Sequence, residues 1–105
     1  MAAPYNPPVK GEDFIFRVAL EDAGTPGSFK ANPTIAAGDF KVSTDGAALA
    51  NLATLPSVEP ASSIWVKVTV SASEMNGDTV AIQAIDQTAT KEWSDFGLCI
   101  PTTAA

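Results

Sequence analysis

The side chains that could carry out chemistry in this chain are few and of limited kinds. Its 105 residues include no histidine, one cysteine (Cys99) and twelve aspartates and glutamates. Histidine is the commonest general base and metal ligand, so neither a zinc nor a copper site is expected. Cys99 stands between Leu98 and Ile100 in an apolar run and has no imidazole partner. It is therefore predicted to be a structural strand residue and not a nucleophile.

The carboxylates are the remaining candidates for catalysis or metal binding. They stand at the ends of predicted strands, as Glu12-Asp13, Glu21-Asp22 and the pair Glu74 and Asp78. Two carboxylates can bind calcium or hydrolyse a glycoside. However, no EF-hand spacing is present, and no P-loop, G-x-S-x-G or dinucleotide fingerprint occurs. The sequence thus predicts no enzyme activity, no metal and no cofactor.

Charge and hydropathy exclude two further classes of partner. The net charge is −6 and the six basic residues are scattered, so binding to nucleic acid is not expected. No apolar run is long enough to span a bilayer, and the first ten residues lack the apolar core of a signal peptide. We expect no membrane partner and synthesis in a cytoplasm.

Residues 64–86 are the stretch around which the rest of the chain is organised. Apolar residues occupy every second position from Ile64 to Val70 and again from Val80, the period of a strand with one buried face. Between these strands, residues 71–74 have the pattern of a capping box, and Asn76-Gly77 is predicted to supply a positive φ. The whole stretch predicts a strand, one helical turn and a returning strand that cross from one sheet to another.

The other elements complete an all-β fold. Strands are predicted over 13–21, within 34–43 and over 92–100, with a hairpin turn at 44–46; residues 47–52 fit either a helix or a strand. The sequence predicts a single immunoglobulin-like β-sandwich of six or seven short strands over residues 12–101. Residues 102–105 are expected to form a fraying C-terminal tail.

Residues 1–11 are rich in proline and are predicted to form an extended N-terminal arm. Two interpretations stay open for this arm: a disordered tail, or a segment that docks on a neighbour through Tyr5 and Val9.

Four large apolar residues are out of phase with the predicted core positions: Ile15, Trp65, Ile85 and Trp93. Either loops or the other sheet cover them, or they form a protein–protein contact, because exposed apolar groups on a small domain often mark an interface. We predict Tyr5, Val9, Ile15 and Trp65 as the interface residues.

Three stretches resemble a set of small structural proteins of tailed bacteriophages and prophages. They are FKANPTIAAGDFKVSTDGAALANLATLPSVEP, VKVTVSASEMNGDTVAIQAID and EWSDFGLCI, in this order, and the resemblance covers about residues 29–101. It implies a virion structural β-sandwich and brings no catalytic residues with it.

This resemblance favours a capsid decoration (cement) protein that binds the outer shell and stabilises it. The expected partners are the major capsid protein and other copies of the chain, with a trimer suggested by analogy. The expected location is the capsid surface of the virion, after synthesis in the host bacterial cytoplasm. Two alternatives stay open: a tail, neck or baseplate module, and a carbohydrate-binding sandwich with Trp65 or Trp93 as its stacking platform.

Overall fold

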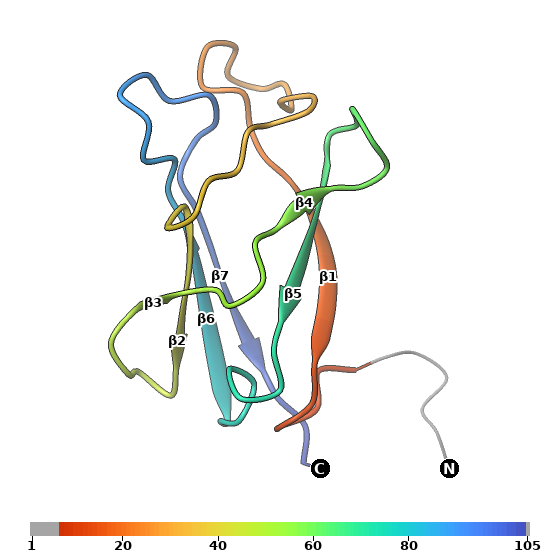
Figure 1. The fold of residues 1–105 in the computed structure, drawn as a ribbon, viewed down its shortest axis with the longest axis vertical. Helices are drawn as coiled ribbons and strands as arrows, with labels where there is room; N and C mark the ends of the chain where they lie inside the picture. Colours follow the sequence, from red (N-terminus) through yellow and green to blue (C-terminus); the bar gives the residue numbers. More distant parts are fainter. Residues whose placement is uncertain (1–6, 105) are drawn as a thin grey trace.

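A computed structural model describes residues 7–104 of the chain. These residues fold into two antiparallel sheets with connecting loops (Figure 1). The three-stranded sheet has the order β1-β5-β4, formed by β1 (Phe14–Ala19), β5 (Trp65–Val70) and β4 (Ser57–Val58). The four-stranded sheet has the order β3-β2-β6-β7, formed by β3 (Ala50–Asn51), β2 (Phe40–Thr44), β6 (Thr79–Ala84) and β7 (Phe96–Pro101). The predicted all-β sandwich of short strands is confirmed.

The strand order is that of an immunoglobulin-like sandwich. In the conventional letters of that fold, one sheet corresponds to strands B-E-D and the other to C′-C-F-G. Residues 7–104 contain no full strand A, the first strand of that fold. In its place Val9 forms a single parallel bridge with Thr103, just beyond β7. The sandwich therefore has β1 and β7 as two of its edge strands.

The core lies between the sheets and follows the predicted alternation. On β5 the inward residues Val66, Val68 and Val70 are fully buried, whereas Trp65, Lys67 and Thr69 point outward. Val80, Ile82 and Ala84 of β6 pack against them from the second sheet. Because each side chain in a strand points to the face opposite its neighbour's, two apolar stripes suffice to define which faces meet.

The connection from β5 to β6 contains the predicted capping box. The Glu74 carboxylate accepts a hydrogen bond from the Ser71 N–H at 2.8 Å, and the Ser71 hydroxyl accepts one from the Glu74 N–H at 3.3 Å. This turn carries the chain from the three-stranded to the four-stranded sheet, as the sequence indicates.

The predicted positive φ at Asn76-Gly77 is wrong, because neither residue has one. Gly77 is instead required by close approach: a Cβ there would lie 2.5 Å from Thr44 Cγ2 and 2.6 Å from Asp45 Oδ2. The turn that packs against Gly77 is the one with positive φ values, at Asp45 (52°) and Gly46 (79°) after β2. The Asp45 carboxylate then accepts hydrogen bonds from the Asp78 and Thr79 N–H groups.

Gly77→Ala is expected to lower the free energy of unfolding by about 1–3 kcal/mol, the usual range for overpacking. The new methyl group would displace the Asp45 carboxylate from its two backbone donors. The matched control is Gly97→Ala, where the nearest atom to a new Cβ is 3.7 Å away. Urea denaturation of both variants measures the difference; equal losses would contradict the steric role of Gly77.

The structure decides between the two interpretations of residues 47–52: they contain strand β3, which pairs with Lys41 and Val42 of β2, and no helix. The C-terminal tail does not fray at Thr102 and Thr103, because the Thr102 N–H donates to the Asp78 carbonyl and the Thr103 N–H to the Pro8 carbonyl.

Candidate functional site

The outer face of the three-stranded sheet carries the exposed apolar residues that the sequence singled out. We use "outer face" for the outward side chains of β1 and β5 together with the adjoining Ser57 and Glu59. Strand register places Ile15 opposite Thr69, Arg17 opposite Lys67, and Ala19 opposite Trp65. The alternation that buries the valines of β5 thus exposes Trp65 on the same strand.

Ile15 and Trp65 lie on this one face at opposite ends. Their side chains are 46% and 44% exposed, respectively. Trp65 is opposite Ala19, which is four residues from Ile15 on β1. Ile15 and Trp65 are therefore separated by about 13 Å along the strand direction. Both predicted residues are therefore available to a single partner surface.

A compact charge cluster lies between these two apolar residues. The Glu59 carboxylate forms ion pairs with Arg17, whose Nη2 is 3.4 Å away, and with Lys67, whose Nζ is 3.6 Å away. All three side chains are partly solvent-exposed, so the pairs are screened by salt and contribute little to folding stability. The outer face consequently has two cations and one carboxylate, although the whole chain is acidic.

The other predicted interface residues lie elsewhere. Val9 is half-buried and forms a bridge with Thr103, just beyond β7. Tyr5 lies outside the described residues. Ile85 is half-buried, and its N–H donates to the Asp39 carbonyl at 2.8 Å. The structure thus brings together Ile15 and Trp65 but does not add Val9 to them.

Trp93 is not a surface residue, which corrects the prediction that it lies out of phase with the core. It is completely buried, its ring centroid is 5.9 Å from that of Phe40, and its Nε1 donates to the Thr34 carbonyl at 3.3 Å. The prediction extended the alternation of Phe96, Leu98 and Ile100 backward to residue 93. However, β7 begins only at Phe96, and Trp93 instead bridges to Asp22.

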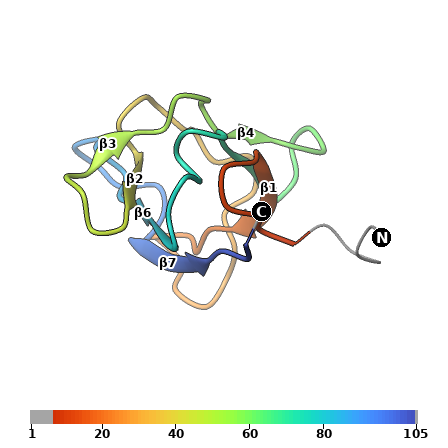
Figure 2. The same ribbon diagram turned by 90° about the horizontal axis from the view of Figure 1, so that it is seen from below.

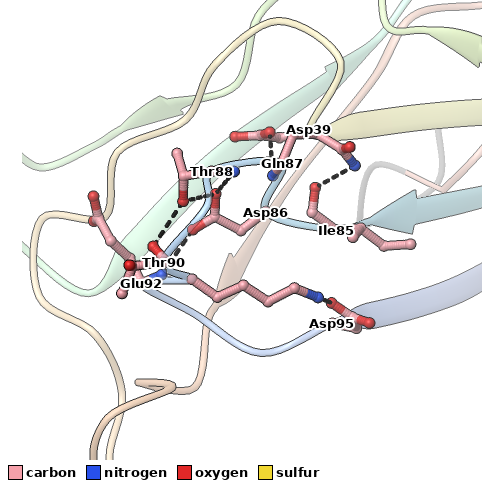
Figure 3. A network of polar contacts seen from close by, with 9 residues as sticks. Asp39, Ile85, Asp86, Gln87, Thr88, Thr90, Glu92 and Asp95 are labelled. Atoms are coloured by element: carbon pink, nitrogen blue, oxygen red, sulfur yellow. Dashed lines mark hydrogen bonds and ion pairs between the residues drawn. The ribbon is translucent and has the colours of Figure 1, made fainter.

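The loops after β1 and after β6 lie at the upper end of the sandwich in Figure 1, and Figure 3 shows a polar network between residues of these loops. The buried Asp39 carboxylate accepts hydrogen bonds from the N–H groups of Ala36 at 2.9 Å and Gln87 at 3.1 Å. The equally buried Asp86 carboxylate accepts from the N–H groups of Thr88 and Glu92, and from the Thr88 hydroxyl. The bond from Gln87 to Asp39 joins the loop after β1 to the loop after β6. The bonds of Asp86 lie within the loop after β6.

Burial by itself would raise the pKa of Asp86, but the hydrogen bonds from Glu92 and Thr88 more than compensate and leave this pKa below its usual value. Asp86 is therefore a charged structural anchor whose oxygens are occupied by backbone and hydroxyl donors. Sequence analysis did not single out Asp39 or Asp86. The available signal was Asp86-Gln87-Thr88, the pattern of an Asx turn.

Three further apolar side chains are exposed, on loops where periodicity predicts nothing: Phe29, Leu49 and Leu55. Phe29, the most exposed at 59%, is in the loop between β1 and β2. These residues are far apart in the sequence and do not share a strand face with Ile15 and Trp65.

Within residues 7–104, no group of three or more His, Cys, Asp or Glu side chains could hold a metal ion. In the same part of the chain, no helix has the length and apolar character needed to cross a membrane. Comparison with known proteins found no matching family model, no matching curated protein and no matching solved structure.

Proposed function

We propose that this chain is a structural protein of a tailed-phage virion, a decoration protein that binds the outer shell through the outer face of the three-stranded sheet. The observation that carries the proposal is the pair of exposed apolar residues, Ile15 and Trp65, on one face of one sheet. The phage origin is supported by the resemblance of the motifs in residues 29–101.

The composition of the outer face suits protein binding. Trp and Arg are the residue types most enriched among those that dominate binding energy, and both Trp65 and Arg17 are on this face. Their backbone is a paired strand of the sheet, so the side chains are displayed with little loss of conformational freedom on binding. Repeated copies on a symmetric shell would add modest individual contacts into strong retention.

Quantitative mass spectrometry of purified virions tests this proposal. It measures the number of copies of this chain relative to the major capsid protein. A decoration protein is expected at one copy per capsid subunit or at a simple fraction of that number. A handful to roughly a few dozen copies would contradict shell binding and favour the tail, neck or baseplate alternative.

Trp65→Ala particles are compared in the same experiment. Truncation of a central Trp in an interface costs about 2 kcal/mol or more, so a roughly 30-fold weaker retention per contact is expected. Leu49→Ala is the matched control, because Leu49 has the same exposed fraction as Ile15 but is not on the outer face. Equal retention of both variants would exclude the outer face as the docking surface.

A further inference from the structure

The connection between β5 and β6 contains the only Asn-Gly pair in the sequence, Asn76-Gly77. This connection lies at the lower end of the sandwich in Figure 1, and Figure 2 looks onto this end. Asparagine followed by glycine is the dipeptide most prone to deamidation, because glycine has no Cβ to obstruct attack by its own backbone nitrogen. Asn76 is exposed, so water can reach its amide. The turn therefore contains a candidate modification site.

Deamidation of Asn76 needs only the Gly77 backbone nitrogen and water. The nitrogen loses its proton and bonds to Cγ of Asn76, the Cγ–Nδ2 bond breaks, and ammonia leaves with that proton. The intermediate is a five-membered cyclic imide. Water then opens the ring at one of its two carbonyls and gives aspartate or isoaspartate. The net change is the replacement of one amide by one carboxyl group, without an oxidant or a metal.

In the closed turn, hydrogen bonds hold the attacking residue. The Gly77 N–H donates to the Met75 carbonyl at 2.9 Å, which is the bond of a γ-turn centred on Asn76. The Gly77 carbonyl accepts a hydrogen bond from the Thr102 hydroxyl at 2.6 Å. Gly77 is thus held through both of its backbone polar groups. Its nitrogen can attack Asn76 only after the N–H has left the Met75 carbonyl.

The segments that hold this turn lie at the ends of strands or outside them. Thr44 is the last residue of β2, and a Cβ on Gly77 would lie 2.5 Å from its Cγ2. Gly11 precedes β1 and donates its N–H to the Met75 carbonyl at 3.0 Å. Thr102 follows the last residue of β7. Because none of these contacts belongs to a ladder between strands, the turn can open while both sheets stay paired.

We propose that Asn76 is a modification site that deamidates through local opening of the β5–β6 turn, and that the isoaspartate product keeps the turn open. In isoaspartate the main chain runs through the side-chain carbons, which adds one CH₂ group immediately before Gly77. The close contact of Gly77 with Thr44 leaves no room for an added carbon. This inference goes beyond shell binding and does not rest on it.

Deamidation of the purified full chain at mildly alkaline pH tests the proposal, by intact mass and by mapping of the tryptic peptide 68–91. Folded wild type is expected to deamidate at Asn76 at least about tenfold more slowly than the chain unfolded in urea. Because the opening is local, the folded rate should exceed the unfolded rate multiplied by the globally unfolded fraction, which urea denaturation gives. Asn51 precedes the bulkier Leu52 and should stay unmodified in both conditions.

Thr102→Val and Thr103→Val are a matched pair of variants. Thr102→Val removes the hydroxyl that donates to the Gly77 carbonyl and lies 3.2 Å from the Asp78 carbonyl, whereas the Thr103 hydroxyl lies 3.4 Å from the Pro8 carbonyl. Loss of one neutral hydrogen bond is expected to make folded Thr102→Val deamidate about 2- to 10-fold faster than wild type. Thr103→Val is expected to match wild type, and all three chains should react equally in urea.

Three results would overturn the proposal. Equal rates for folded and unfolded wild type would show that the turn does not restrain Gly77. A folded rate no greater than the unfolded rate multiplied by the globally unfolded fraction would exclude local opening. Equal rates for folded Thr102→Val and Thr103→Val would exclude the bond to Gly77 as the restraint.

The isoaspartate form is separated from the unmodified chain by ion-exchange chromatography, because it carries one more negative charge. It is expected to melt at a lower temperature than the unmodified chain, since the contacts of the closed turn are lost. An unchanged melting temperature would contradict the persistent opening of the turn. Virion copy number is measured separately, so failure of this proposal and failure of shell binding are distinguishable.

Discussion

Trp93→Ala is expected to lower the free energy of unfolding by about 3–5 kcal/mol, the range for removing a buried large aromatic side chain. Trp93 is completely buried, packs against Phe40, and donates its indole N–H to the Thr34 carbonyl. Alanine would leave a large cavity and an unpaired carbonyl in the region that joins the upper loops to the core. A domain of this size has only about 5–15 kcal/mol of stability, so this substitution removes a large fraction of it.

Thermal and urea denaturation measure the effect, with Trp65→Ala as the matched control. The same substitution at Trp65 removes a side chain that is 44% exposed and contacts solvent on the outer face. We expect a melting temperature lowered by more than about 10 °C for Trp93→Ala and a much smaller change for Trp65→Ala. Similar losses at both positions would contradict the assignment of Trp93 to the core and Trp65 to the surface.

Asp86→Asn is expected to destabilise the domain by about 1–3 kcal/mol at neutral pH, the range for leaving buried hydrogen-bonding groups unsatisfied. The amide can replace only one of the two carboxylate oxygens as an acceptor, and its NH₂ group would face the donors of Thr88 or Glu92. These contacts hold the loop after β6 in its conformation.

The loss should depend on pH in a defined direction. The pKa of Asp86 in the folded protein lies below its usual value, so its charge contributes stability above the unfolded pKa of about 3.9. That contribution disappears as the pH falls through the folded pKa. The difference between wild type and Asp86→Asn should therefore be largest near pH 7 and become smaller below about pH 4.

Urea denaturation at neutral and acidic pH gives this comparison. Asp95→Asn is the control, because Asp95 is an exposed partner of Lys91 and should change stability by less than about 1 kcal/mol. A difference for Asp86→Asn that stays constant with pH would show that the carboxylate charge plays no part.

The elements with regular alternation were predictable from the sequence. Val66, Val68 and Val70 define the inner face of β5, and this also places Trp65 and Lys67 outside. The same reasoning placed Ile15 of β1 out of phase with the core, and Ile15 is exposed. The capping box at Ser71 and Glu74 was predictable because its two hydrogen bonds are local in sequence.

Irregular segments were not predictable in this way. Trp93 precedes the first residue of β7, so a period of two does not apply to it. Gly77 is required because Thr44 and Asp45, more than thirty residues away, approach its Cα. Asp39 is an anchor because it accepts from Gln87, which belongs to a loop distant in the sequence. The bonds of Asp86 stay within its own loop, but its burial depends on how that loop packs on the sandwich.

The sequence by itself therefore determined the all-β class, the crossing between the sheets and the outward position of Ile15 and Trp65. These follow from local periodicity and from hydrogen bonds between near neighbours, both of which are properties of short stretches of chain. Only the tertiary structure decided that Trp93 is core, that Gly77 must lack a side chain, and that β1 and β7 are edge strands. Each of these depends on how closely two distant segments approach, and that distance is set by the packing of the whole sandwich.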